Sequence, residues 1–247
     1  MKNVYYETPL KSIARKVLLK FGINFRASAL PGISAFGVNF YVDRKRIKHR
    51  SQYALDFCLK KVPQSVLDVG SGENIHANAF ANSGANVTCI DYGTSVYAQK
   101  SEVNSAIRLI TCDFLKLDLK EKFELVWCSH TLEHVPNVGI FIQKLIEFCR
   151  DDGCICITVP DLHRKLYSGH LTLWTPGLLA YNVVLQGLDL SEACFVKGTN
   201  EFSLIFRPVK ANLPDNLTFD FGDLTLLQHL LPAEIGENVD PWKVEYK

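Results

Sequence analysis

The sequence lacks a long uninterrupted apolar run. Its best candidate for a membrane-spanning helix, LTLWTPGLLAYNVVLQG, is interrupted by Pro176 and Asn182, whereas a spanning helix needs about 20 apolar residues. The first residues, MKNVYYETPLKS, also lack the apolar core of a secretory signal. We therefore expect a cytoplasmic protein without a transmembrane segment.

Paired cysteine motifs are absent as well. None of the eight cysteines stands in a CxxC pair, and most lie inside apolar runs such as NVTCID and GCICITV. This pattern indicates free, buried thiols in a reducing compartment.

The charge is unevenly distributed along the chain. Residues 1–61 contain 13 Lys and Arg against three acidic residues, whereas the remainder contains 14 basic and 23 acidic residues. Apolar positions from Leu10 to Phe21 follow helical spacing with basic residues between them. A loop, RASALPGISAFG, follows, and residues 44–61 read as a second helix. The pattern predicts a basic, helical N-terminal cap over residues 1–61.

Short apolar runs alternate with helix-like segments after Pro63. The runs SVLDVG, ANVTCID, AIRLITCD, FELVWCS and CICITVP are continuous, which predicts strands covered on both faces. This is typical of an α/β, doubly wound fold with a mostly parallel sheet. Helices are predicted at 75–84, 94–100, 138–150 and 176–187, with a β-hairpin around Gly198-Thr199-Asn200. We expect this domain over residues 62–210 and an acidic C-terminal extension over 211–247.

A turn containing two glycines follows the first predicted strand. The stretch VLDVGSGENIH places four residues before a helix: Asp68, Gly70, Ser71 and Gly72. Glycines let a backbone turn tightly and approach a ligand, although Asn74 stands where a dinucleotide fingerprint has its third glycine. Asp91 ends the second strand 23 residues after Asp68, close to the spacing at which a carboxylate accepts hydrogen bonds from ribose.

Five segments in this order resemble the class I S-adenosylmethionine-dependent methyltransferases: VLDVGSG, CIDYG, ITCDF, FELVWCSHTLEHVPN and CRDDGCICITVPD. The resemblance implies a Rossmann-like, mostly parallel sheet of seven strands in the order 3-2-1-4-5-7-6 and S-adenosyl-L-methionine as cofactor. It also implies cofactor contacts for nine residues: Asp68, Gly70, Ser71 and Gly72 along the methionine part, Asp91 at the ribose, Tyr92, Asp113 and Phe114 at the adenine, and Ser129 near the methyl group.

The stretch SHTLEHVPN has the letters of an inverted zinc-protease motif, His130-x-x-Glu133-His134. That motif needs a helix of about three turns, but here a predicted strand precedes it and Pro136 limits any helix. We instead expect the stretch at the carboxyl end of the fourth strand, facing the sulfonium methyl. Some quinone-type O-methyltransferases carry an acid-x-x-Glu-His version associated with a divalent ion. Because His130 replaces that acid, the sequence does not favour a metal and we assign no metal ligand, although an ion at this segment stays an open alternative.

An acceptor hydroxyl needs a base, and histidine suits this role because its ordinary pKa of about 6.5 lies near neutral pH. We predict His130 as the base from its position. His170 is the second candidate, because it resembles a Gly-His segment that borders the acceptor pocket in relatives, together with Tyr167 and Trp174. The remaining candidates are His134 and His163.

The acceptor is predicted from a further absence. The Asn/Asp-Pro-Pro-aromatic tetrapeptide of nucleic-acid amino-methyltransferases is missing, with SHTL in its place, which favours oxygen as the acceptor atom. Our hypothesis is O-methylation of a sugar or glycan, as in bacterial surface-polysaccharide enzymes. The basic cap would attract an anionic acceptor or lie on a membrane that carries a lipid-linked one; a solvated helix face is the other interpretation. Open alternatives are a quinone-type or lipid O-methyltransferase, an RNA methyltransferase, and a non-catalytic cofactor-binding partner protein.

Overall fold

The computed structural model describes residues 50–100, 104–162, 169–220, 222–233 and 235, together with the backbone of two short strands before them. The helix predicted from Leu10, and the candidates His163 and Tyr167, lie outside the described residues. The two short strands, β1 (Gly32–Ala35) and β2 (Val38–Tyr41), pair antiparallel. The loop predicted at residues 26–37 is therefore wrong over Gly32–Ala35.

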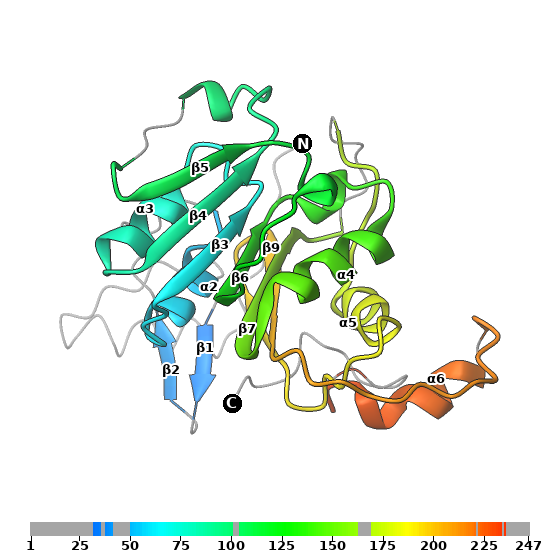
Figure 1. Cartoon of the computed structure of the whole chain (residues 1–247). Helices are drawn as coiled ribbons and strands as arrows, with labels where there is room; N and C mark the ends of the chain where they lie inside the picture. Colours follow the sequence, from blue (N-terminus) through cyan, green and yellow to red (C-terminus); the bar gives the residue numbers. More distant parts are fainter. Residues whose placement is uncertain are drawn as a thin grey trace, which may run out of the picture.

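Seven strands form one sheet in the order β5-β4-β3-β6-β7-β9-β8, drawn in Figure 1. They are β3 (Ser65–Val69), β4 (Asn86–Asp91), β5 (Ile107–Thr111), β6 (Phe123–Ser129), β7 (Cys149–Pro160), β8 (Cys194–Lys197) and β9 (Glu201–Phe206). Strands β3 to β7 pair in parallel, and β9 runs antiparallel to both β7 and β8. The predicted order 3-2-1-4-5-7-6 is confirmed.

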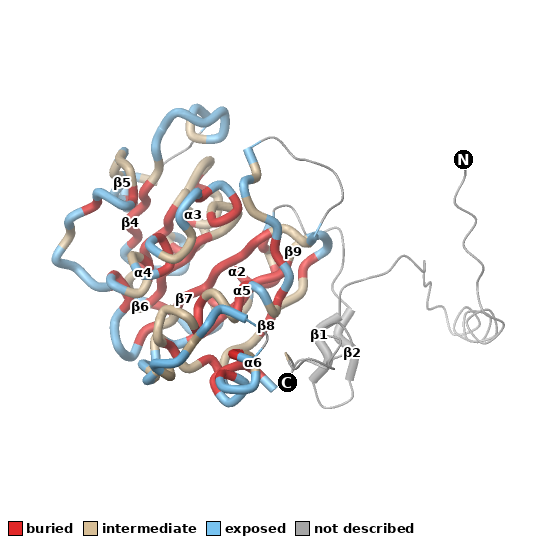
Figure 2. Tube along the Cα trace, turned by 90° about the vertical axis from the view of Figure 1, so that its right-hand side faces the viewer, coloured by how far each residue is buried: buried red, intermediate tan, exposed pale blue. Residues whose placement is uncertain are grey.

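Helices cover both faces of this sheet. They are α2 (Gln52–Leu59), α3 (Ile75–Asn82), α4 (Val138–Phe148), α5 (Pro176–Val184) and α6 (Gly222–Leu227), with short 3-10 turns η1 (Ala98–Lys100), η2 (Phe114–Lys116), η3 (Leu132–His134) and η4 (Gln228–Leu230). Figure 2 shows the central strands buried along most of their length and the connecting loops exposed.

The core lies in two layers, one on each face of the sheet. Successive side chains of a strand point to opposite faces. On β6, Val126 and Cys128 accordingly join the layer under α4 and α5, whereas Leu125 and Trp127 join the layer under α2 and α3. The predicted continuous apolar runs thus reflect burial from both sides.

The predicted helices at 75–84, 138–150 and 176–187 end earlier in the structure, at Asn82, Phe148 and Val184. Helix α4 ends at Phe148 because Cys149 already pairs with Phe123 as the first residue of β7. The helix predicted at 94–100 is reduced to the single turn η1. The predicted hairpin is confirmed, with β8 and β9 on either side of Gly198-Thr199-Asn200.

Described residues of both flanking segments pack against the sheet. Ala54 and Leu55 of α2 lie in one core layer, and Leu227 and Leu230 of the C-terminal segment lie in the other. The domain boundaries at 61 and 210 stay a prediction. Among the described residues, no helix is both long and apolar enough to cross a bilayer.

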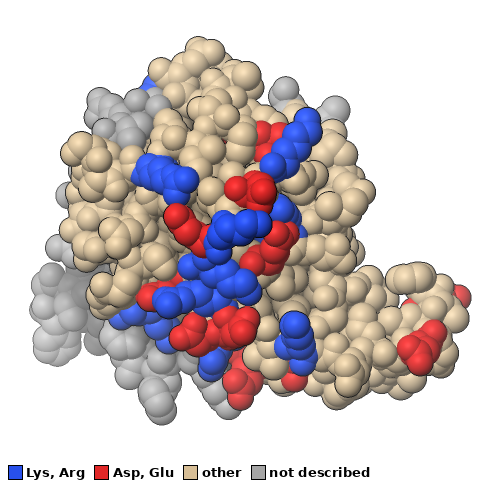
Figure 3. Space-filling model, in the orientation of Figure 1, with Lys and Arg blue, Asp and Glu red and all other residues tan. Residues whose placement is uncertain are grey.

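Charges of both signs are mixed among the described residues of the face in Figure 3. The structure pairs several of the chain's charged side chains, such as Arg150 with Glu124 at 2.6 Å and Arg108 with Glu121 at 3.1 Å. The eight cysteines are all unpaired, as predicted. Burial raises the pKa of the Cys149 thiol to about 12, so it stays protonated at neutral pH.

Candidate active site

The glycine turn leaves the carboxyl end of β3 and packs against the segment that follows β6. Gly70 has φ +76°, and a Cβ there would lie 2.1 Å from Thr131 Oγ1. Its N–H donates to the Ile90 carbonyl at 2.7 Å. Asn74, at the missing third glycine, keeps the left-handed conformation with φ +58°, which Asn adopts more readily than most side chains. The turn therefore retains a glycine-like path without that glycine.

Two carboxylates stand at this turn. Asp91 accepts from Gly72 N at 2.9 Å and from Gly93 N at 2.8 Å, one bond to each oxygen. Asp68 is buried, and its Oδ2 has no hydrogen-bond partner among the described residues. Burial, followed by the charge of Asp91, raises the pKa of Asp68 to about 7. A cationic donor that reached this oxygen would relieve a costly buried acceptor.

The rim beyond Asp91 exposes aromatic surface. Tyr92 is 63% exposed, and its hydroxyl donates to Asp113 Oδ1 at 3.1 Å. Tyr97 is 53% exposed, and its Cβ lies 3.4 Å from the position of a Cβ on Gly72. The sequence analysis missed Tyr97, because nothing in its local pattern distinguishes it from a surface tyrosine.

Phe114 differs from its predicted position beside a ligand. Its ring packs against Phe141 and Phe148 in the core, with centroid distances of 5.0 and 5.8 Å, and the residue is 5% exposed. The ring therefore packs in the core, and the predicted place of Phe114 alongside the adenine stays a prediction that its backbone can still meet.

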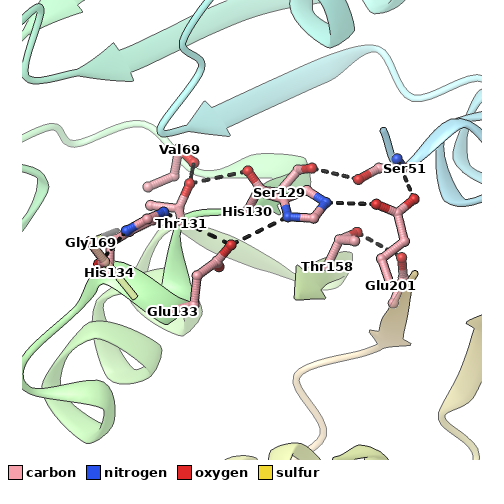
Figure 4. Close-up of polar contacts among 11 residues, drawn as sticks. Ser51, Val69, Ser129, His130, Thr131, Glu133, His134, Thr158, Gly169 and Glu201 are labelled. Carbon is pink, nitrogen blue, oxygen red and sulfur yellow. Dashed lines mark hydrogen bonds and ion pairs between the residues drawn. The ribbon is translucent and has the colours of Figure 1, made fainter. Parts of the chain in front are cut away.

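The end of β6 and the segment after it carry the predicted residues Ser129, His130 and His134 (Figure 4). Thr131 Oγ1 donates to the Val69 carbonyl at 3.1 Å, which joins this segment to the glycine turn. Ser129 Oγ lies 2.6 Å from the hydroxyl of Ser51, just before α2. The 3-10 turn η3 then presents Glu133 and His134, so the structure brings the predicted histidine segment and the predicted cofactor turn together.

His130 lies between two carboxylates, as Figure 4 shows. Its Nε2 is 2.7 Å from Glu201 Oε2, and its Nδ1 is 3.3 Å from Glu133 Oε1. Burial alone would lower the pKa of His130, but the hydrogen bond to Glu201 and the negative charges of Glu133 and Glu201 outweigh it and raise the pKa to about 9. Both ring nitrogens thus face carboxylates in this arrangement, and the role of His130 as general base stays a prediction.

His134 has the opposite character. Its Nδ1 lies 2.6 Å from the Gly169 carbonyl, which can only accept, so Nδ1 carries a hydrogen and, in the neutral form of the ring, Nε2 holds the lone pair. Nε2 is 4.0 Å from Glu133 Oε1. The His170 ring meets the His134 ring edge to face, with centroids 4.9 Å apart. Burial lowers the pKa of His170 and outweighs the charge of Glu133, so its ring is neutral at pH 7.

Glu133, His134 and His170 form a set of potential metal ligands. Their ligand atoms all lie within 4.8 Å of one another. Glu133 is fully buried, and neither carboxylate oxygen accepts a hydrogen bond from a described residue. Two imidazoles and a carboxylate suit several divalent metals, so these residues fit such an ion.

Two residues of the site were missed by the sequence analysis. Glu201 lies 71 positions after His130, and Ser51 lies 150 positions before Glu201, whose Oε1 accepts from Ser51 N at 2.5 Å. Contacts at these separations follow from strand pairing and leave no local sequence signal.

A mostly parallel sheet in this order, with a glycine turn and strand-end aspartates at one edge, defines the class I S-adenosylmethionine-dependent methyltransferases. Residues 67–157 of the chain match the family model described as "Methyltransferase domain". S-adenosylmethionine is the cofactor of these enzymes.

Curated relatives are similar over part of their length. The chain is 28% identical over 151 residues to a ubiquinone biosynthesis O-methyltransferase of Pseudomonas fluorescens, covering 59% of each chain. It is 31% identical over 157 residues to the ubiquinone biosynthesis O-methyltransferase of Actinobacillus pleuropneumoniae, covering 60% of this chain and 61% of that protein. The chain thus spans about three fifths of these relatives' length.

Solved structures agree on the fold. The 1,6-didemethyltoxoflavin-N1-methyltransferase of Burkholderia thailandensis, with bound 1,6-didemethyltoxoflavin and S-adenosylhomocysteine, has a TM-score of 0.55 at 17% identity, covering 85% of this chain and 94% of its own. Human N-acetylserotonin methyltransferase with S-adenosylmethionine has a TM-score of 0.54 at 17% identity, covering 65% of this chain and 52% of its own.

Proposed function

We propose that this protein transfers the methyl group of S-adenosylmethionine to a hydroxyl of a small aromatic acceptor of the quinone-precursor type. The sequence analysis favoured a sugar or glycan. The ubiquinone O-methyltransferases that match over residues of the sheet domain instead support the quinone-type alternative. Nothing in these relatives supports a glycan, and the mixed charges in Figure 3 do not favour a nucleic-acid track on that face.

The described residues fit the cofactor. The backbone of Gly70 and Gly72 would lie along its methionine part, where a Cβ on Gly70 would collide with Thr131. The unpartnered Asp68 Oδ2 suits a cationic ammonium group. Asp91, whose oxygens keep further lone pairs, would accept from ribose hydroxyls, and the exposed ring of Tyr92 would stack on the adenine.

The observation that carries the proposal is the fixed tautomer of His134, three residues after Thr131, the residue that contacts the glycine turn. When bound, the cofactor supplies a sulfonium methyl group that is transferred by in-line displacement. His134 Nε2 would take the proton of the acceptor hydroxyl as its oxygen becomes nucleophilic. The imidazolium that results would face Glu133, 4.0 Å away. His170 would border the same acceptor.

A divalent ion is the second candidate for activating the hydroxyl. This ion is favoured because Glu133, His134 and His170 each offer a ligand atom, all within 4.8 Å of one another. Such an ion would lower the pKa of a bound phenol. In the His134 mechanism, EDTA leaves turnover within twofold; a loss restored by Mg²⁺ or Mn²⁺ would establish the metal instead.

The test is S-adenosylhomocysteine release with a panel of catechols, nucleotide sugars and neutral glycans. We expect turnover with catechols. His134→Ala should lower kcat by about 100-fold or more, the scale of a lost general base, with cofactor affinity unchanged. His229→Ala, an exposed histidine on η4, is the matched control. Turnover confined to sugars, or full activity of His134→Ala without metal dependence, would refute the proposal.

A further inference from the structure

Glu201 reaches the methyl-transfer site from the antiparallel hairpin. It is the first residue of β9 and stands opposite Pro160 at the carboxyl end of β7, whose neighbour β6 ends at Ser129. Its side chain passes over Gly198, where a Cβ would lie 2.4 Å from Glu201 Cγ. The turn glycine therefore makes room for this glutamate.

Both oxygens of Glu201 are occupied by groups of the site. Oε2 is paired with His130 Nε2 at 2.7 Å, and Oε1 accepts from the backbone N–H of Ser51 at 2.5 Å. The side chain is 12% exposed. A carboxylate with both oxygens engaged in this way has little left to offer a substrate.

The His130 ring links Glu201 to Glu133, because its two nitrogens contact one carboxylate each. Its backbone takes the left-handed conformation at φ +53°, and its N–H donates to the Thr158 carbonyl at 2.9 Å. With Nε2 held by Glu201, the ring can direct only Nδ1 at Glu133, 3.3 Å away. Glu133 is fully buried, and a buried carboxylate without a cationic neighbour is strongly destabilising.

We propose that Glu201 is a positioning residue for methyl transfer: it fixes the His130 ring, which holds Glu133 in the orientation that His134 requires. This inference rests on the proposed function. Glu201 itself touches neither cofactor nor acceptor in this arrangement. The same carboxylate holds the N–H of Ser51, so the residue before α2 and the acceptor side of the site share one anchor.

The kinetic test compares Glu201→Gln with Glu192→Gln, the same chemical change at an exposed position before the hairpin. Ser51 N and His130 Nε2 face different oxygens of Glu201, and glutamine replaces one of them with an NH2 group, which can only donate. We expect kcat for a catechol to fall roughly 10- to 100-fold, as for other residues that orient a catalytic group, while the Kd for S-adenosylhomocysteine stays within twofold. Glu201→Asp, which keeps the charge, should recover several-fold of that loss.

A second variant perturbs the same contact without removing the carboxylate. Gly198→Ala would push Glu201 away through the 2.4 Å approach of its Cβ. It should reproduce the fall in kcat with unchanged cofactor affinity. If Glu201→Gln and Gly198→Ala both keep kcat within twofold of Glu192→Gln, or lose cofactor binding in the same proportion, Glu201 has no positioning role.

A spectroscopic readout separates this inference from the proposed function. Proton–nitrogen correlation spectra of the histidine rings report the hydrogen bond between His130 Nε2 and Glu201 in the wild type. Glu201→Gln should displace the Nε2–H signal of His130 and move the ring signals of His134, whereas Glu192→Gln should not. If the wild type methylates no catechol but these shifts occur, the proposed function fails and the positioning contact stands. Superimposable histidine spectra would overturn the contact whatever the acceptor.

Discussion

Replacement of Gly70 by alanine tests how the cofactor turn is built. Gly70 has φ +76°, and its ideal Cβ would lie 2.1 Å from Thr131 Oγ1 and 2.7 Å from Thr131 Cγ2. The left-handed conformation alone costs a residue with a Cβ about 1–2 kcal/mol. Thr131 must also move, which breaks its hydrogen bond to the Val69 carbonyl, worth about 1 kcal/mol.

These costs sum to about 2–3 kcal/mol. If the whole amount weakens cofactor binding, the affinity for S-adenosylhomocysteine falls by about 30- to 150-fold. Titration calorimetry with S-adenosylhomocysteine measures the affinity, and urea unfolding measures the part that falls on stability. Gly84→Ala is the matched control, because Gly84 has φ +99° with nothing within 4 Å of its Cβ position. It should lose stability by the conformational cost alone and keep the cofactor affinity of the wild type.

The double variant with Thr131→Gly separates the steric share from the conformational share. Thr131→Gly removes the side chain that the new methyl group meets. It should therefore lower stability and cofactor affinity less in the Gly70→Ala protein than in the wild type. Additive losses in this cycle, or wild-type affinity and stability in Gly70→Ala, would refute the assignment of this close approach.

Two further outcomes follow from buried groups of the site. Because the pKa of Asp68 is raised to about 7, the folded state binds more protons than the unfolded chain between about pH 4 and 7, and stability falls as the pH rises through that interval. Asp68→Asn should therefore raise the free energy of unfolding of the cofactor-free protein at pH 8 by up to about 4 kcal/mol. Near pH 4 the variant and the wild type should be equally stable, and the variant should bind S-adenosylhomocysteine more weakly. Equal pH dependence of stability in both proteins would contradict this. Phe114→Ala removes a ring packed against two others and should lower the free energy of unfolding, measured by chemical denaturation, by about 3–5 kcal/mol. Asp113→Asn should instead lower cofactor affinity with a smaller change in stability. The reverse pattern would indicate that the Phe114 ring contacts the cofactor.

The sheet was predictable because its signals are local. Continuous apolar runs predicted the five parallel strands, and Gly198-Thr199-Asn200 predicted the hairpin. Asp68 and Asp91 were placed at strand ends by spacing, and the structure puts both at the glycine turn. Helix ends were less accurate, since the end of α4 depends on the pairing of Cys149 with β6.

The roles of individual side chains could not be predicted in the same way. His130 and His134 are chemically identical in the sequence, and their different characters come from partners 71 and 35 positions away, Glu201 and Gly169. Phe114 was expected at a ligand, yet which side of a short turn its ring takes depends on neighbours from α4. Tertiary pairing therefore decides the chemistry at positions where residue type alone leaves it open.

The hydrogen bond between Ser51 and Glu201 spans 150 positions, and this separation has a consequence for the order in which the protein is made. The residues at the nucleoside side, from Asp68 to Asp113, leave the ribosome well before the hairpin that carries Glu201. A nascent chain that has not reached β9 would present β7 as an open sheet edge, prone to pairing with other chains. Completion of the last hairpin thus covers the edge of β7 and finishes the acceptor side in a single event.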